Sequence, residues 1–151
     1  MRFLGIDYGI KRIGLAVSDE NHRLAFPKEI VLNNLNVFKH LGEIIKTENI
    51  SEIVIGESVD FSGKLNALSA RIEVFVLELK KKFKLPIYKQ KEFLTSVEAR
   101  RFSDGLSAQA GKKNLNQSQA HSKIKQIKSG HIDASAAALI LQRYLDKKNL
   151  I

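Results

Sequence analysis

Two aspartates of this sequence stand where an unpaired carboxylate would be costly. Asp7 ends the apolar segment of residues 3–6. Asp133 belongs, at helical spacing, to the same apolar stripe as Ala137 and Leu141. A carboxylate in such a place must be paired, solvated or bound to a metal ion. Structural roles stay open, because Asp7 could accept hydrogen bonds in the turn that follows it and Asp133 could cap a helix.

Two glutamates follow predicted strands and could join these aspartates. Glu92 comes directly after Lys91, beyond a strand predicted over residues 86–90, and Glu57 follows a strand predicted over 53–56. Taken alone, each is an ordinary solvated acid, and nothing in the spacing chooses between them. Carboxylates gathered from separate segments would repel one another without cations. Two-metal phosphodiester cleavage uses such carboxylates to hold Mg²⁺ or Mn²⁺, so nuclease chemistry would explain them.

Positive charge is concentrated in one part of the chain. The whole sequence carries a formal charge of +9, and residues 80–128 alone hold thirteen Lys or Arg against three Asp or Glu. Such clustering favours a polyanion as partner, with nucleic acid first. We expect Lys112 and Lys113 to contact phosphates. The lysines at 80–84 are better explained as a solubilising face at the end of a helix.

The elements that would carry these residues follow an α/β pattern. Strands are predicted over 2–7, 13–19, 24–32, 53–56 and 86–90, and helices over 35–45, 65–83, from Thr95, and 131–147. We predict one domain with a mixed five-stranded sheet, made of a three-stranded antiparallel meander and two parallel strands and flanked by helices. Residues 105–130 are predicted to form a flexible basic loop. The alanines of the last helix would allow it to approach the sheet closely.

Length and composition exclude several classes of protein. The 151 residues support one compact domain, and the absence of cysteine excludes disulfides, thiolate nucleophiles and cysteine-ligated zinc. No apolar run approaches the length needed to cross a bilayer, so we expect a cytoplasmic protein without membrane contact. ATPases built on a similar first hairpin need two such domains, which this length cannot supply.

Several segments resemble the YqgF family, also called the Holliday-junction-resolvase-like or pre-16S rRNA nuclease family. The resemblance spans nearly the whole chain and lies in Gly5-Ile6-Asp7-Tyr8-Gly9, Lys11 to Asp19, Ile55-Gly56 with Gly63, Leu94 to Ala99, and Ile132 to Gln142. The family usually has Asp-Glu-Arg where this chain has Lys91-Glu92-Phe93, so Glu92 matches while both flanking residues differ.

This resemblance implies an RNase H-like fold and endonuclease action on structured RNA or DNA. It also implies that Asp7, Glu92 and Asp133 are the carboxylates that bind Mg²⁺ or Mn²⁺. We therefore expect a metal-dependent endonuclease that matures the 5′ end of pre-16S rRNA. Lys11 and Arg12, beside the first hairpin, are further candidates for nucleic-acid contact, although an exposed turn would also explain them.

Two alternative functions stay open. A Holliday junction resolvase would use the same chemistry on branched DNA, and its symmetric cuts would require a dimer, so the chain could be a monomer or a homodimer. A non-catalytic RNA-binding module would need the basic loop but none of the carboxylates. Dependence of cleavage on a divalent metal ion would distinguish an enzyme from such a module.

Overall fold

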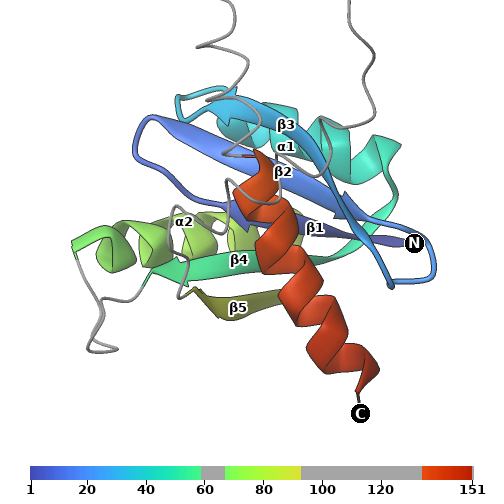
Figure 1. Ribbon diagram of the computed structural model, residues 1–151. Helices are drawn as coiled ribbons and strands as arrows, with labels where there is room; N and C mark the ends of the chain where they lie inside the picture. The colour runs from blue at the N-terminus through green and yellow to red at the C-terminus, as the bar shows by residue number, and fades with distance from the viewer. Residues whose placement is uncertain (59–66, 93–133, 151) are drawn as a thin grey trace, which may run out of the picture.

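The computed structural model describes residues 1–58, 67–92 and 134–150 (Figure 1). The elements are β1 (Arg2–Asp7), β2 (Arg12–Ser18), β3 (Ala25–Leu32), α1 (Val37–Thr47), β4 (Ile50–Ser58), α2 (Ala67–Phe83), β5 (Ile87–Glu92) and a C-terminal helix described over 134–149. None of the helices in these segments is long and apolar enough to span a membrane.

The five strands form one mixed sheet in the order β3-β2-β1-β4-β5. β1, β2 and β3 pair antiparallel, whereas β4 pairs parallel with both β1 and β5. The predicted antiparallel meander with two added parallel strands is therefore confirmed. Because β1, β4 and β5 run in the same direction, their carboxyl ends meet at one edge of the sheet, to the left in Figure 1.

Most element boundaries differ from the sequence prediction by one to three residues, and three of these differences are informative. β4 is longer than the apolar run of residues 53–56, because it continues through polar residues at both ends. β5 continues to Glu92, which makes this acid the last residue of the strand. Leu35 was wrongly assigned to the first helix: α1 begins at Val37, and Leu35 is fully exposed before it.

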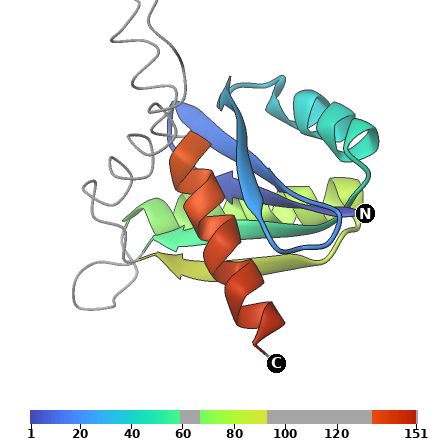
Figure 2. The same cartoon turned by 45° about the vertical axis from the view of Figure 1, so that its right-hand side comes forward.

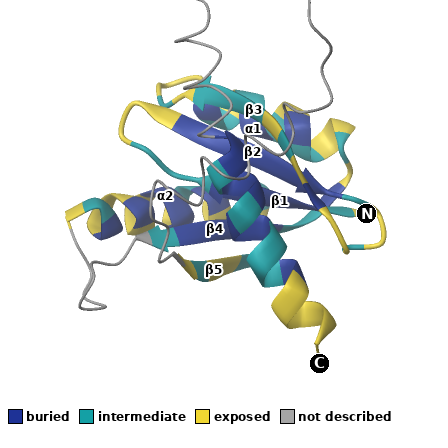
Figure 3. Ribbon diagram, viewed as in Figure 1, coloured by how far each residue is buried: buried dark blue, intermediate teal, exposed yellow. Residues whose placement is uncertain are grey.

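The sheet separates two hydrophobic clusters. On one face, α1 and α2 cover large side chains of the strands, including Leu4, Ile6, Ile53 and Ile55; we call this the α1/α2 face. On the other face, the C-terminal helix covers a cluster that includes Phe3 and Val54; we call this the C-terminal helix face. Figures 1 and 2 show the C-terminal helix crossing the sheet on the side opposite α2, and Figure 3 shows the buried central strands between the layers.

The C-terminal helix lies unusually close to β1. A Cβ added to Gly5 would lie 2.8 Å from Leu141 Cβ and 2.9 Å from the carbonyl oxygen of Ala137, distances that no real side chain tolerates. Only glycine at this position of β1 permits this approach. The predicted close approach of this helix to the sheet is confirmed.

Polar contacts hold the rest of the C-terminal helix in place. Gln142 accepts a hydrogen bond from the backbone N–H of Ala25 at 2.8 Å and donates one to the carbonyl oxygen of Arg23 at 2.8 Å. Lys148 pairs with Glu52 of β4 at 2.8 Å, and Tyr144 donates to the same carboxylate at 3.4 Å. Burial and the neighbouring charge of Glu52 raise the pKa of Tyr144 to about 12. These contacts fix the direction in which the helix crosses the strands.

Candidate active site

The carboxyl edge of the three parallel strands carries three of the four candidate acids, Asp7, Glu57 and Glu92. Asp7 is the last residue of β1 and is half-buried. Glu92 is the last residue of β5, where it pairs with Ser58 of β4. Asp133 lies outside the described residues, one position before the first described turn of the C-terminal helix. The sheet topology therefore brings Asp7 and Glu92 to the same edge from segments 85 positions apart.

Strand alternation places Asp7 on the C-terminal helix face. Phe3 and Gly5 contact the C-terminal helix, and Asp7 follows them at the period of two that β-strands impose. Tyr8, the next residue, packs on the opposite face, with its ring centroid 5.0 Å from that of Phe75 in α2. Asp7 thus belongs to the side of the sheet that the C-terminal helix covers.

The same alternation places Glu57 on the other face of the sheet. Ile53 and Ile55 belong to the cluster under α1 and α2, whereas Val54 belongs to the cluster under the C-terminal helix. β4 keeps an unbroken register with β5 from Ile53 to Ser58, so Glu57 shares the orientation of Ile55. Glu57 therefore lies on the face opposite Asp7, although the sequence alone could not separate it from Glu92.

A tight hairpin beside Asp7 carries the candidate cations Lys11 and Arg12. A Cβ added to Gly9 would lie 2.3 Å from the carbonyl oxygen of Arg12, so the turn requires glycine at this position. Asn33 clasps the turn from β3: its side chain donates to the carbonyl oxygen of Gly9 at 2.9 Å. Its backbone N–H donates to the carbonyl oxygen of Lys11 at 2.9 Å. Both cations are exposed on a hairpin held at the edge that carries Asp7.

Sequence reasoning missed the role of Asn33. The reason is that its partner, Gly9, is 24 positions away in the sequence. An Asn at a turn is common, and nothing local distinguishes one that clasps a second turn. Only the pairing of β2 with β3 reveals this contact.

The described part of the basic region is divided between opposite ends of the sheet. Lys80, Lys81 and Lys82 form the last turn of α2, which leads directly into the start of β5. They therefore lie at the end of the sheet opposite Asp7. Lys91 stands near the carboxyl end of β5 and is exposed, whereas Lys89 forms an ion pair with Glu73 of α2. Lys112 and Lys113 lie outside the described residues.

Within the described segments, no group of three or more acidic or histidine side chains could hold a metal ion. The three candidate carboxylates include Asp133, so the described residues contain at most two of them. Asp7 and Glu92 offer carboxylate oxygens, which are the donors that Mg²⁺ and Mn²⁺ prefer. The donor type and the common sheet edge fit a divalent cation.

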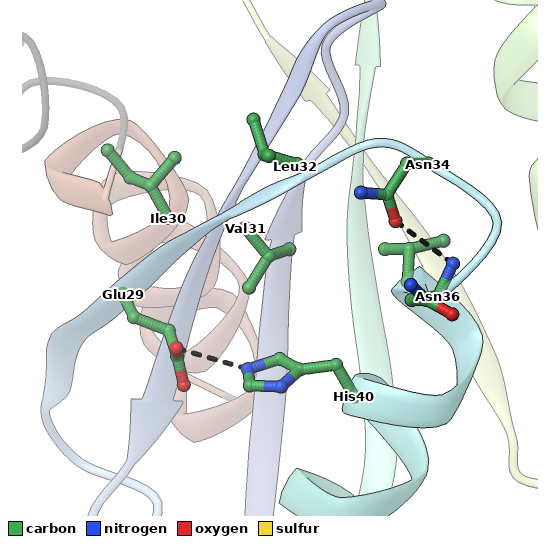
Figure 4. Close-up of a pocket in the computed structure, with 8 residues that line it drawn as sticks. Glu29, Ile30, Val31, Leu32, Asn34, Asn36 and His40 are labelled. Carbon is green, nitrogen blue, oxygen red and sulfur yellow. Dashed lines mark hydrogen bonds and ion pairs between the residues drawn. The ribbon is translucent and has the colours of Figure 1, made fainter.

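A shallow groove of about 310 Å³ lies elsewhere, between β3 and α1 (Figure 4). Its polar side chains include Glu29 and His40, which pair with each other at 3.1 Å, together with Asn34 and Asn36. Asp7 and Glu92 are not among its lining residues. The groove is therefore separate from the carboxylate edge.

The fold is that of RNase H-like resolvases. The chain is similar to Thermus thermophilus RuvC in complex with a Holliday junction substrate, with a TM-score of 0.59 and 16% identity over 99% of this chain and 96% of that chain. It is also similar to the fowlpox virus Holliday junction resolvase, with a TM-score of 0.58 and 12% identity over the full length of both chains. At such low identity the similarity shows the fold alone.

Sequence comparison identifies the family. The sequence model of the RuvX family, described as Holliday junction resolvase, matches residues 1–147, and the chain belongs to this family. A relative from Lawsonia intracellularis is 34% identical over 97% of this chain and 94% of its own length; one from a Sulfurihydrogenibium species is 36% identical over 97% and 90%. Both carry the name "Putative pre-16S rRNA nuclease". The resemblance to the YqgF family is confirmed.

Proposed function

We propose that this protein is a metal-dependent endonuclease that hydrolyses phosphodiester bonds during 5′-end maturation of pre-16S rRNA in the cytoplasm. The observation that carries the proposal is the position of Asp7: a half-buried acid at the carboxyl end of the central strand, on the face covered by the C-terminal helix. Membership of the RuvX family and the names of its relatives support nuclease chemistry on this fold.

Asp7, Glu92 and Asp133 are the proposed metal-binding carboxylates. The path of the C-terminal helix supports the inclusion of Asp133. Phe3 lies against Tyr144, with ring centroids 6.3 Å apart, and Gly5 lies against Leu141 and Ala137. A step of two residues toward the carboxyl end of β1, from Phe3 to Gly5, therefore corresponds to about one turn toward the start of the helix. A further step of two residues, from Gly5 to Asp7, would reach the turn that contains residue 133.

Strand alternation supports the inclusion of Glu92. Tyr88 of β5 packs against Tyr144 of the C-terminal helix, with ring centroids 5.4 Å apart, so even-numbered positions of β5 belong to that face. Residue 92 is also an even-numbered position of this strand. The proposed site therefore draws one acid each from β1, β5 and the C-terminal helix, and excludes Glu57.

Divalent cations bound by these carboxylates would activate a water molecule and stabilise the leaving oxygen. The protein itself would supply the orientation of substrate. Lys11 and Arg12, on the clasped hairpin beside Asp7, would bind phosphates next to the scissile bond. Lys112 and Lys113 would bind phosphates further along the nucleic acid. Positive side chains in these places would offset the repulsion between the carboxylates and the nucleic acid.

A Holliday junction resolvase is the second candidate function. The description of the family and the branched-DNA substrate of the similar RuvC structure favour it. Its substrate has two strands to cut, so it would require two active sites related by symmetry. The two functions share the catalytic residues and differ in the nucleic acid that is cleaved.

The test is cleavage of a pre-16S rRNA fragment and a four-way DNA junction, side by side, with Mg²⁺, with Mn²⁺ and with a chelator. We expect metal-dependent cleavage of the ribosomal fragment. Asp7→Asn, Glu92→Gln and Asp133→Asn should each reduce the cleavage rate on the order of 10²-fold or more, because each removes a charge that holds the metal ions.

Glu57→Gln is the matched control, because it removes an acid from the same sheet edge but from the other face; its cleavage rate should equal that of the wild type. Preferential cleavage of the junction would identify a resolvase instead. Tight RNA binding without cleavage under every metal condition would identify a non-catalytic module and contradict the proposal.

A further inference from the structure

The groove between β3 and α1 has an apolar base and polar sides (Figure 4). Val37, which is buried, and Val31, which is half-buried, belong to the hydrophobic layer under α1 and α2. The volume of about 310 Å³ is at the lower end of the range of small-molecule sites. Such a groove fits a small flat group that is apolar on its faces and polar at its edge. Four polar side chains line it: Glu29, Asn34, Asn36 and His40.

The charge of the groove disfavours a phosphate group as its ligand. Within the described part of the chain, no Lys or Arg lines the groove, whereas Glu29 does. Nε2 of His40 lies 3.1 Å from Oε2 of this carboxylate. That contact engages one of the two oxygens, and a carboxylate has room for about four hydrogen bonds. The groove therefore favours an uncharged ligand that donates hydrogen bonds to Glu29.

Amide groups supply the opposite kind of hydrogen bond at the start of α1. Oδ1 of Asn34 accepts from the backbone N–H of Asn36 at 2.9 Å, which leaves the NH₂ group of Asn34 as a donor. Asn36 makes no side-chain capping hydrogen bond, although it directly precedes α1. The groove thus offers carboxylate acceptors on the β3 side and amide donors on the α1 side (Figure 4).

Among the bases of RNA, guanine carries the complementary groups on one edge. Its N1–H and its N2 amino group are adjacent donors, and its O6 is the acceptor beside them. A carboxylate can accept from both donors at once. Adenine has an acceptor at N1, uracil has a single donor, and cytosine has its one amino donor next to an acceptor. Each of these three bases therefore matches the groove less well.

The register of the strands places this groove near Asp7. Asp7 pairs with Gly14 of β2, and Gly14 pairs with Ile30 of β3, which lines the groove. Two strand spacings, about 10 Å, therefore separate Asp7 from Ile30. Leu32, another lining residue, pairs with Arg12 of the hairpin that carries the candidate cations. Because β3 is an edge strand, a nucleic-acid strand can pass over its end from the face of Asp7 to the groove.

Leu32 adds an exposed apolar surface to the groove. It is a large aliphatic side chain, and 64% of its surface is exposed. Proteins bind unpaired bases of RNA through the apolar faces of the bases as well as through their polar edges. A base in the groove would cover Leu32 and remove this apolar surface from water.

We propose that the groove between β3 and α1 binds a guanine base of a single-stranded RNA segment beside the cleaved phosphodiester bond. Glu29 accepts hydrogen bonds from N1–H and the N2 amino group. The amides of Asn34 and Asn36 donate to O6, and Leu32 contacts the face of the base. That this base belongs to the substrate rests on the proposed nuclease function, whereas the affinity of the groove for guanine does not.

The first experiment is an NMR titration of the full chain, labelled with nitrogen-15, with the 5′-monophosphates of guanosine, inosine and adenosine. All three carry the same ribose phosphate, so a difference between them reports on the base. We expect guanosine monophosphate to shift the amide signals of Val31, Asn34 and Asn36, with a dissociation constant on the order of millimolar. Inosine monophosphate lacks the N2 amino group, and adenosine monophosphate also lacks N1–H. Both should bind about fivefold more weakly or worse.

The second experiment repeats the titration with variants of the groove. Glu29→Gln presents an amide donor to the donors of guanine, so the affinity for guanosine monophosphate should fall about tenfold while that for adenosine monophosphate does not. Asn36→Ala removes a donor to O6 and should weaken guanosine monophosphate several-fold. Glu43→Gln, at an exposed acid of α1 that does not line the groove, is the matched control and should bind like the wild type. The same spectra show that each variant is folded.

The third experiment connects the groove to the substrate. Each guanine near the cleavage site of a pre-16S rRNA fragment is replaced by inosine, one at a time. One such replacement should raise KM several-fold for the wild type and leave it unchanged for Glu29→Gln, because both changes remove the same hydrogen bond. If no nucleic acid is cleaved but the titration shows the expected preference for guanine, the groove is a guanine site and the nuclease function is wrong.

Three outcomes would overturn the guanine site. The groove signals could stay unshifted at tens of millimolar guanosine monophosphate, which would show that the groove takes no base. All three nucleotides could produce equal shifts, which would show that the protein binds their shared ribose phosphate. The affinity for guanosine monophosphate could be unchanged in both Glu29→Gln and Asn36→Ala, which would place the base elsewhere on the protein.

Discussion

The two faces of the sheet are packed by different means. On the α1/α2 face, two helices bury large aliphatic and aromatic side chains such as Leu4, Leu79 and Phe75. On the C-terminal helix face, one helix contributes Ala137 and Ala138 and lies almost directly on the backbone of β1 at Gly5. The α1/α2 face therefore buries a large volume of apolar side chains, whereas the C-terminal helix face brings a helix close to the strand backbone.

This difference assigns the two faces different tasks. Large buried side chains remove the most apolar surface from water, so the α1/α2 face should contribute most of the stability. Backbone contact leaves little freedom in the position of a helix, so the C-terminal helix face is suited to hold catalytic groups from distant segments in register. Of the proposed metal ligands, Asp7 belongs to the second face.

The largest expected effect on stability is on the α1/α2 face. Leu79 is completely buried, and Leu79→Ala should lower the free energy of unfolding by about 2–5 kcal/mol through lost burial and a cavity. Urea denaturation measures the change. Leu35→Ala, at a fully exposed site, is the control and should change stability by less than about 0.5 kcal/mol.

Cleavage by the folded fraction of Leu79→Ala should stay at the wild-type rate, because the cavity lies on the face away from Asp7. A large loss of cleavage in well-folded protein would show that the two faces do not have separate tasks.

A smaller effect on stability, but a larger one on function, is expected at Gly5. Gly5→Ala forces the added Cβ against Ala137 and Leu141, so the C-terminal helix must shift. We expect this shift to lower the free energy of unfolding by about 1–3 kcal/mol. Because that helix leads to Asp133, the cleavage rate should fall even at temperatures where the variant is fully folded. Thermal unfolding and cleavage assays on the same sample measure both.

The same substitution on the other face is the control. A Cβ at Gly42 of α1 would lie 3.3 Å from a ring carbon of Phe83, a half-buried side chain at the end of α2 that can move slightly. Alanine also favours the helix over glycine by about 1 kcal/mol. Gly42→Ala should be neutral or stabilising and leave cleavage unchanged. Equal loss of cleavage in both variants would contradict the role assigned to the C-terminal helix.

The smallest expected effect is at the far end of the sheet. Glu48, at the end of α1, pairs with Lys28 at 2.5 Å and Arg2 at 2.6 Å. The hydrogen bond from Lys28 is the main reason why the pKa of Glu48 lies below its usual value. Glu48→Gln should therefore lower the free energy of unfolding by up to about 1 kcal/mol near neutral pH.

The pH dependence follows from the direction of that shift. A lowered pKa in the folded state means that the stabilisation is present above the ordinary pKa of glutamate and is lost as the pH falls through the folded-state value. The difference between wild type and Glu48→Gln should shrink over that acid range. Glu43→Gln, at an exposed acid of α1, is the control and should change the free energy of unfolding by less than about 0.5 kcal/mol; an effect equal to that of Glu48→Gln would contradict the assignment.

Much of the fold could be predicted from local patterns. The apolar runs at 2–7 and 53–56 identified the central strands, and helical spacing identified α1 and α2, because burial on one or two faces leaves a direct periodic trace in sequence. The assignment of Leu35 to the first helix was wrong for the same reason. Leu35 continues the helical period, but the turn at Asn33 and Asn34 comes first and α1 begins only at Val37.

For the candidate site, the sequence by itself determined which acids needed an explanation. Asp7 could be singled out because it ends an apolar strand, Asp133 because it shares an apolar stripe at helical spacing, and Glu92 by its match to the family motif. The sequence could not choose between Glu92 and Glu57 as the third candidate acid, since both follow short predicted strands and both have charged or polar neighbours.

Only the tertiary structure shows that Glu57 lies on the face opposite Asp7, that Asn33 clasps the Gly9 turn and that the C-terminal helix contacts Gly5. Each depends on the register between segments that are far apart in the chain, and register is set by which side chains pack together. Local periodicity records that a residue is buried, but the face it belongs to and the segment it meets are properties of the whole packed core.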